Sequence, residues 1–130
     1  MIKRILDIDS YWKVIVYYNV DYNFFDIVYA DLKSIGTSTK TINRIYYNLK
    51  NHSIKGVTVS NTKKKVSVVL FCEHKSRADY INTVVHEAEH IKQSMLYTYN
   101  VKDKGEPPAY TIGFLVMKML VFKVMKAKSR

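Results

Sequence analysis

Two histidines and a glutamate stand close together in the stretch 81–90, which reads I-N-T-V-V-H-E-A-E-H. His86 and His90 are four residues apart, so on a helix they lie on the same face, with their Cβ atoms about 6 Å apart. Two imidazoles presented in this way can occupy two corners of a tetrahedral zinc site. Glu87 lies beside them and could take a proton from a water molecule on the metal. The spacing therefore predicts a hydrolytic metal site with Glu87 as general base.

The residues around this motif fit the helix that it requires. Ser76 followed by Asp79 resembles a capping box, with Asp in place of the usual Glu. Beyond this cap, apolar residues repeat at helical spacing: Ile81, Val84, Val85, Ala88 and Ile91. We therefore expect a helix over 76–100, with Asn100 as its stop signal.

A hydrolytic zinc site takes three protein ligands and leaves the fourth position to water. The third ligand should come from a later element that packs back against the motif helix. Glu106 is the favoured candidate, because it follows a short polar connection and stands at the start of an apolar helix expected over 106–127. Asp103 is a weaker alternative. Tyr110, one helical turn after Glu106, could face the same cavity and hydrogen-bond the carboxylate or stabilise an oxyanion.

Residues 1–53 are expected to supply one strand and two amphipathic helices. Residues 12–20, rich in β-branched and aromatic side chains, read as the strand. The apolar faces of the two helices are formed by residues at helical spacing: Phe24, Val28, Leu32 and Ile35 in the first, and Ile42, Ile45, Tyr46 and Leu49 in the second. Gly36 separates the two helices and is a typical residue just past a helix end.

In residues 54–75 the hydrophobic pattern changes from helical to alternating, which is typical of a β-hairpin. Residues 60–62 are expected to form its turn, and three lysines at 63–65 follow where solvent can reach them. In the second strand, alternate residues should point to opposite faces: Val66, Val68 and Leu70 to one, Val69 and Phe71 to the other. The hairpin then leads directly into the motif helix.

The composition indicates one folded domain, because a chain of 130 residues can bury a single core. Its one cysteine, Cys72, excludes an internal disulfide framework, and we expect a packed thiol there and a surface histidine at His74. The longest apolar run, 111–122, is interrupted by Lys118 and is shorter than the roughly 20 residues that span a bilayer. Charges near the N-terminus argue against a secretory signal.

The net charge of +10 could serve nucleic acid, an anionic surface or an acidic protein partner. The lysines are concentrated beside the predicted turn and in the C-terminal tail. Because no module for binding nucleic acid is recognisable, specific nucleic-acid binding is not expected. The sequence leaves the oligomeric state open.

The segment V-V-H-E-A-E-H-I, followed by E-P-P-A-Y-T-I-G-F-L, resembles small zincin-like proteins encoded by bacteriophages and by mobile elements of gut Bacteroidales. In that family the H-E-x-x-H helix is followed by a segment like E-x-x-A-Y-x-x-G. Seven residues match these two motifs by position: His86, Glu87, His90, Glu106, Ala109, Tyr110 and Gly113. The resemblance covers about 55–120, and the double proline after Glu106 departs from the family's pattern.

The resemblance implies an α+β fold: a minimal zincin-like domain with a small antiparallel or mixed sheet packed on helices, and a C-terminal helix. It implies Zn2+ held by His86, His90 and Glu106, with Glu87 and Tyr110 as catalytic residues. The protein would be a gluzincin-type metallopeptidase of peptide or protein substrates, in the cytoplasm of the bacterial host or in the virion. The alternative is a non-catalytic virion or host-interaction protein that keeps a zincin-like fold. The intact Glu87 favours the enzyme, and the small size favours the alternative.

Overall fold

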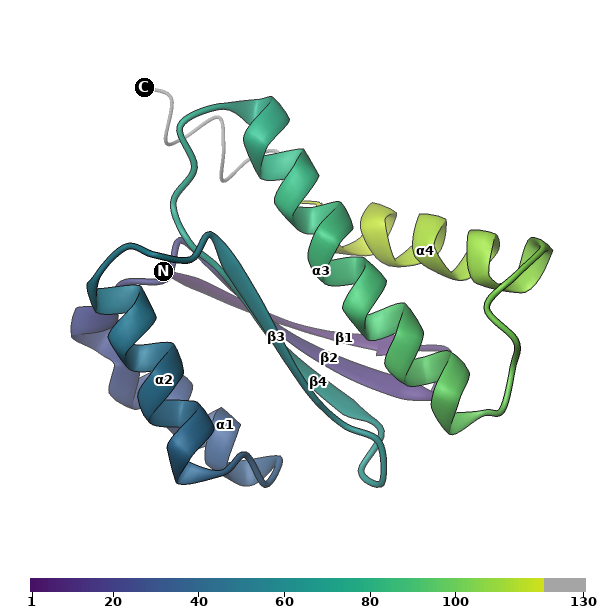
Figure 1. Ribbon diagram of the computed structural model, residues 1–130, viewed down its shortest axis with the longest axis horizontal. Coiled ribbons are helices and arrows are strands. Elements are labelled where there is room, and N and C mark those ends of the chain that lie inside the picture. Colours follow the sequence, from purple (N-terminus) through teal and green to yellow (C-terminus); the bar gives the residue numbers. More distant parts are fainter. Residues whose placement is uncertain (121–130) are drawn as a thin grey trace.

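Four stretches rich in β-branched and aromatic residues form one mixed sheet in the computed structural model, which describes residues 1–120 (Figure 1). The strands and helices follow one another along the chain: β1 (Ile2–Ile8), β2 (Trp12–Tyr18), the short 3-10 helix η1 (Tyr22–Phe24), α1 (Phe25–Ser34), α2 (Thr39–Lys50), β3 (Gly56–Asn61), β4 (Val66–Phe71), α3 (Arg77–Thr98) and α4 (Glu106–Met119). The predicted α+β class is confirmed.

The strand order in the sheet is β1-β2-β4-β3. β1 runs antiparallel to β2, β2 parallel to β4, and β3 antiparallel to β4. Every residue of β4 is buried, as expected for a central strand covered on both faces. β3, by contrast, lies at an edge of the sheet and is only partly buried throughout. The hairpin predicted over 54–75 corresponds to β3 and β4.

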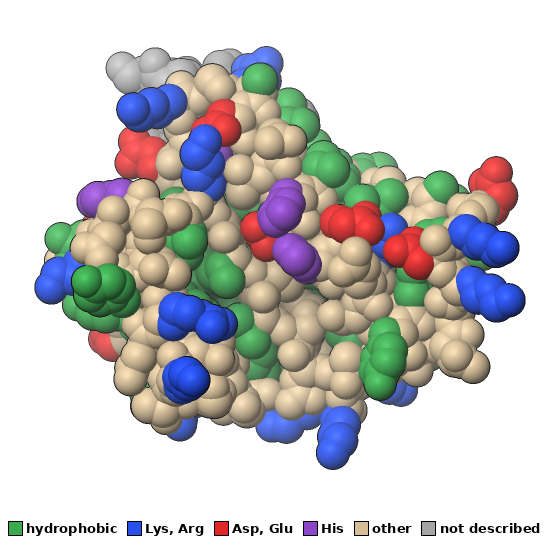
Figure 2. Space-filling model, viewed as in Figure 1, with side chains coloured by type: hydrophobic (Ala, Val, Ile, Leu, Met, Phe, Trp, Pro, Cys, Tyr) green, Lys and Arg blue, Asp and Glu red, His purple; other side chains and the backbone are tan. Residues whose placement is uncertain are grey.

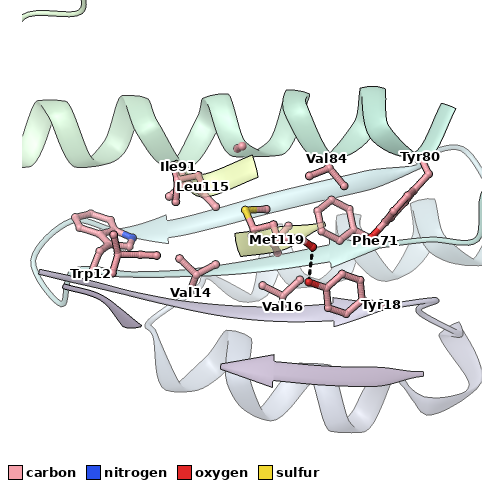
Figure 3. Packing of buried hydrophobic residues seen from close by; sticks show 13 residues of the cluster. Trp12, Val14, Val16, Tyr18, Phe71, Tyr80, Val84, Ile91, Leu115 and Met119 are labelled. Atoms are coloured by element: carbon pink, nitrogen blue, oxygen red, sulfur yellow. Dashed lines mark hydrogen bonds between the residues drawn. The ribbon is translucent and has the colours of Figure 1, made fainter. Parts of the chain in front are cut away.

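Helices cover both faces of the sheet. On one face, α1 and α2 pack on the inward side chains of β2 and β4, among them Ile15, Val68 and Leu70. On the other face, α3 and α4 pack on the alternate residues of the same strands. Figure 3 shows this second core, in which Tyr18 of β2 donates a 2.6 Å hydrogen bond to the carbonyl of Met119 in α4. The alternation predicted for residues 66–71 is thus the reason that β4 contributes to two separate cores.

The first strand and the start of α1 differ from the prediction. Residues 1–53 contain two strands rather than one, because Ile2–Ile8 pairs antiparallel with β2. In α1 the buried aromatic residue is Phe25, whereas Phe24 belongs to η1 and is 55% exposed. The 3-10 turn that begins at Asp21 shifts the helical face by one residue, while Val28 remains buried on that face.

The C-terminal helix is shorter than the predicted 106–127. α4 ends at Met119, and Leu120 is extended; residues 121–127 lie outside the described residues. Gly113 belongs to this helix, and no atom lies within 4 Å of the position its Cβ would take. Within the described part of the chain, no helix combines the length and the apolar character needed to cross a bilayer.

Candidate functional site

His86 and His90 lie in the middle of α3 with exposed side chains that converge on each other. Their Nε2 atoms are 3.3 Å apart, and their ring planes are inclined at 85°. Each ring therefore directs its Nε2 atom towards one common point in solvent. Figure 2 shows them as the purple pair at the centre of one face of the molecule.

The separation of these two nitrogens is the one that a zinc ion would impose. With Zn–N bonds of about 2.0–2.1 Å and tetrahedral angles, two imidazole nitrogens lie about 3.3–3.4 Å apart. The pair at 3.3 Å therefore has the separation that two corners of a zinc site require, and it is also within reach of a mutual hydrogen bond.

Glu87 is directed towards the sheet instead of the solvent. Its side chain is only 4% exposed, and its Oε1 accepts a 2.8 Å hydrogen bond from the hydroxyl of Thr58 on β3. The close approach of α3 to β3 depends on Gly56, since a Cβ there would lie 3.1 Å from Glu87 Oε2 and 2.8 Å from Thr83 Cγ2. The missing side chain of Gly56 therefore makes room for the carboxylate against the edge strand.

A shallow groove of about 350 Å3 runs between β3 and α3 beside the histidines. Its lining is almost entirely polar and rich in hydroxyl groups: Thr58, Ser60, Thr62, His90, Gln93, Ser94 and Tyr97. One wall is the edge strand and the other is the face of α3 that carries His90. The groove therefore combines a candidate metal ligand with the free edge of a sheet.

The backbone of β3 has unpaired groups along this edge. The amide of Cys72 donates a 2.9 Å hydrogen bond to the carbonyl of Lys55, so these two residues form a hydrogen-bonded pair in the antiparallel register. In an antiparallel ladder such pairs alternate with residues whose N–H and C=O point away from the partner strand. Gly56, Thr58 and Ser60 therefore direct their backbone groups away from β4.

Glu106 is not grouped with the histidine pair. Glu106 is the exposed first residue of α4, and Tyr110 is 75% exposed one turn later. Within residues 1–120, no three His, Cys, Asp or Glu side chains are grouped so that they could hold a metal ion. The structure thus groups His86 and His90 with Glu87 next to them in the chain, while the roles of Glu106 and Tyr110 stay predictions.

The other carboxylates near the end of α3 are occupied by a lysine. Lys92, which is largely buried, forms ion pairs with Glu89 at 2.7 Å and with Asp103 at 3.0 Å. Both carboxylates raise the pKa of Lys92, most strongly through the hydrogen bond that Lys92 donates to Glu89. Asp103, the weaker candidate for third ligand, therefore connects the loop after α3 to the helix itself.

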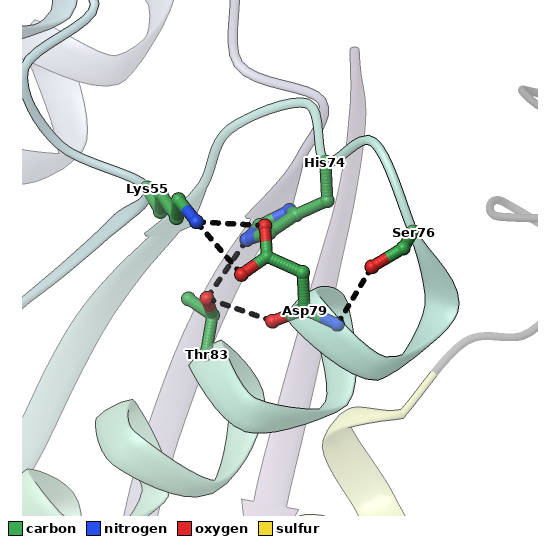
Figure 4. A network of polar contacts seen from close by, with 5 residues as sticks. All are labelled: Lys55, His74, Ser76, Asp79 and Thr83. Atoms are coloured by element: carbon green, nitrogen blue, oxygen red, sulfur yellow. Dashed lines mark hydrogen bonds and ion pairs between the residues drawn. The ribbon is translucent and has the colours of Figure 1, made fainter.

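His74 is buried, not at the surface as predicted, and belongs to a polar network at the start of α3 (Figure 4). Its Nε2 lies 2.8 Å from the hydroxyl of Thr83, which donates its own proton to the carbonyl of Asp79 at 3.2 Å. Burial lowers the pKa of His74, opposed by a hydrogen bond to the backbone of Cys72.

The same network connects α3 to the beginning of the hairpin. The ammonium of Lys55 contacts both oxygens of the Asp79 carboxylate at 2.7 and 2.8 Å. Asp79 thus fills the predicted cap position, where its amide bonds to Ser76, and also forms an ion pair across to the sheet. Lys55 and Asp79 are far apart in the chain, so residue spacing gave no signal for this contact.

A larger hollow of about 920 Å3 lies at the carboxyl ends of the parallel strands β2 and β4. Several of its ionisable residues are already paired: Lys55 with Asp79, and His74 with Thr83. The thiol of Cys72 also lines it, and burial, followed by the charge of Glu87, raises the pKa of that thiol to about 11. This thiol is therefore protonated at neutral pH, in keeping with a packed structural cysteine.

Comparisons with protein-family models, with curated proteins and with solved structures gave no match for this chain. The function of the site is therefore inferred from its own residues. Two features set it apart from the rest of the described surface: the converging imidazoles and the carboxylate packed beside a free strand edge.

Proposed function

We propose that this chain is a zinc-dependent peptidase of the gluzincin type, in which His86 and His90 bind the metal. The observation that carries the proposal is the 3.3 Å separation of their Nε2 atoms. Zinc bound there would supply Lewis acidity and lower the pKa of a coordinated water towards about 7. The resemblance of residues 86–113 to phage zincin-like proteins supports the same assignment, with action in the host cytoplasm or the virion.

Glu87 is the proposed general base. Its carboxylate takes a proton from the attacking water as the water oxygen bonds to the peptide carbonyl carbon, and later gives that proton to the leaving amine nitrogen. The hydroxyl of Thr58 holds one carboxylate oxygen at 2.8 Å and Oε2 lies against Gly56, so Glu87 has to turn towards the histidines for this proton transfer. Thr58 therefore orients the base without reacting itself.

The substrate is proposed to bind as an added strand along β3. An extended peptide can pair with the outward N–H and C=O groups of Thr58 and Ser60 by β-augmentation. Because the side chain of Thr58 contacts Glu87, a peptide paired at this residue would pass close to the base. The groove is shallow, so side-chain recognition beyond this backbone pairing would involve few residues.

Glu106 is the proposed third ligand. In the structure it begins α4 and is not grouped with the histidines, so binding the metal requires the first turn of α4 to move towards α3. The exposure of Glu106 and Tyr110 leaves both side chains without a packing role that would oppose such a movement.

A non-catalytic role is the second candidate, as a virion or host-interaction protein with a zincin-like fold. It is favoured by the shallow groove and by the separation of Glu106 from the histidine pair. Under this alternative the edge of β3 would bind a partner's strand and release it unchanged.

Hydrolysis of a mixed peptide library, followed by mass spectrometry, distinguishes the two candidates. The zinc-supplied wild-type protein is expected to cleave, and Glu87→Gln is expected to lose about 10²- to 10⁴-fold of the rate, which is the usual contribution of a general base. Glu89→Gln is the matched control, since Glu89 pairs with Lys92 instead of facing the groove. Equal cleavage by Glu87→Gln, or none by the wild type, would reject the peptidase.

A further inference from the structure

The edge strand β3 belongs to a part of the chain that has no acidic residue. Residues 32–72 contain eight lysines or arginines and no aspartate or glutamate. This segment includes all of α2, β3 and β4, so it supplies most of the net charge of +10. The strand side of the groove therefore belongs to a basic segment without an acidic residue of its own, whereas the α3 side carries Glu87 and Glu89.

Three of these cations follow the groove directly. Lys63, Lys64 and Lys65 are exposed in the turn after β3, just beyond Thr62, which lines the groove. Their recorded contacts are with neutral groups: Lys64 Nζ donates to the carbonyl of Ser34 at 2.9 Å, and Lys65 Nζ lies 5.2 Å from the ring centroid of Tyr99.

Four acidic side chains of the described residues pair with lysines outside the hairpin turn. Asp31 pairs with Lys3, Asp79 with Lys55, and Glu89 and Asp103 pair with Lys92. Positive charge at the end of the groove is thus available to an incoming ligand.

The other side of the groove is also basic. α2 carries Lys40, Arg44 and Lys50 on its exposed side, and α2 and α3 lie on opposite sides of β3 in Figure 1. Figure 2 shows Lys and Arg side chains below the two histidines, on a face that also carries acidic side chains beside, above and to the right of them. A strand added to β3 would therefore run along a surface that is positive at its end and on one side.

We propose that the groove along β3 selects extended peptide segments rich in aspartate and glutamate. This inference rests on the proposed function, since it names the substrate class of the same site. The outward amides and carbonyls of β3 match the repeat of a peptide backbone, and the lysines at 63–65 attract carboxylates at its far end. Thr62, Ser94 and Tyr97 of the lining carry hydroxyl groups that can donate hydrogen bonds to those carboxylates.

An acidic peptide fits these observations better than a nucleic acid does. Single-stranded nucleic acids are bound by aromatic side chains on which successive bases stack, together with a basic groove. The groove here contains two ring side chains, His90 and Tyr97, among hydroxyl and amide side chains, and His90 is assigned to the metal. Unpaired backbone groups at a sheet edge, in contrast, recognise another peptide strand.

Binding to the Glu87→Gln protein tests the proposal without cleavage. Fluorescent peptides of equal length, one rich in glutamate, one neutral and one rich in lysine, would be titrated by anisotropy at low salt. The acidic peptide is expected to bind about tenfold more tightly than the neutral one, because each exposed charge pair contributes a few tenths to 1 kcal/mol. Salt at several hundred millimolar should remove most of the difference.

Two charge-matched variants show which lysines cause the preference for the acidic peptide. K63Q/K64Q/K65Q should reduce the preference for the acidic peptide to about twofold or less, whereas K75Q/K104Q/K118Q removes three exposed lysines from other places and should retain it. Circular dichroism and thermal unfolding check that both variants fold. If both variants lost the preference for the acidic peptide equally, the preference would come from net charge alone, and the proposal would be overturned.

The remaining outcomes separate this inference from the peptidase itself. No preference for the acidic peptide, or tighter binding of a single-stranded oligonucleotide that displaces it, would overturn the substrate class even if the wild type hydrolyses peptides. A retained preference that depends on residues 63–65 would support the substrate class even if no hydrolysis is found, and the peptidase alone would then fall.

Discussion

The hydroxyl of Thr58, on the edge strand β3, donates a 2.8 Å hydrogen bond to the carboxylate of Glu87, in the middle of α3. These residues lie 29 positions apart in the chain. Their contact connects the groove's strand wall to the proposed general base. The orientation of that base therefore depends on the position of α3 against the sheet, which Gly56 and the Lys55–Asp79 ion pair also determine.

Replacing Thr58 by valine should weaken both stability and hydrolysis. The substitution keeps the shape of the side chain but removes the donor to a carboxylate that is 4% exposed, and an unsatisfied buried group costs about 1–3 kcal/mol. The free energy of unfolding from urea titration measures this loss. Thr58→Ser retains the hydroxyl and is the control; if it lost as much as Thr58→Val, the hydrogen bond would not be the cause.

Gly56→Ala should destabilise the protein, while Gly113→Ala should not. At Gly56 the new Cβ would lie 2.8 Å from Thr83 Cγ2, and relieving such overpacking typically costs about 1–3 kcal/mol. At Gly113, within α4, nothing lies within 4 Å, and alanine gains up to about 1 kcal/mol of helix propensity. The midpoint temperature of thermal unfolding should therefore fall in Gly56→Ala and rise in Gly113→Ala, each relative to the wild type. A Gly56→Ala protein as stable as the wild type would contradict the close α3–β3 contact.

Protonation of His74 should lower the free energy of unfolding in mild acid. Burial lowers the pKa of His74 below its ordinary value of 6.5, so between the lowered pKa and about 6.5 the unfolded state binds more protons than the folded state. The contribution of the neutral His74 to the free energy of unfolding is thus fully present above pH 6.5. It is lost as the pH falls through the lowered pKa. Urea unfolding of the wild type and His74→Gln at several pH values between 5 and 7.5 checks this.

The variant His74→Gln keeps a group that can donate to Thr83 but does not titrate, so its stability should depend less on pH in this range. A wild-type protein whose stability rises as the pH falls from 7 to 5, relative to that variant, would show that the histidine is charged in the folded state.

The parts of the fold that the sequence predicted are local. The helix around His86 and His90 follows from a cap and an apolar repeat within one stretch, and the hairpin follows from alternation on both sides of a turn. The convergence of the two imidazoles could also be expected from their spacing alone. These features depend on residues that are near one another in the chain.

The features that escaped prediction depend on distant partners. β1 was missed because its strand state comes from pairing with β2, and half of its side chains are exposed. The burial of His74 depends on Thr83 and the start of the hairpin, and the partner of Glu87 comes from another element. The position of Glu106 depends on how α4 packs behind α3, which residue spacing does not determine.

The most direct test of the central claim is the zinc content of the purified protein after zinc is supplied and excess metal is removed. The wild type should hold one zinc per chain, and His86→Ala and His90→Ala should lose it, because each removes one of two converging ligands. Glu106→Ala should weaken zinc binding, whereas His52→Asn, which removes an exposed histidine elsewhere, should retain it. A wild type that holds no zinc, or a His90→Ala protein that holds as much as the wild type, would contradict the metal site.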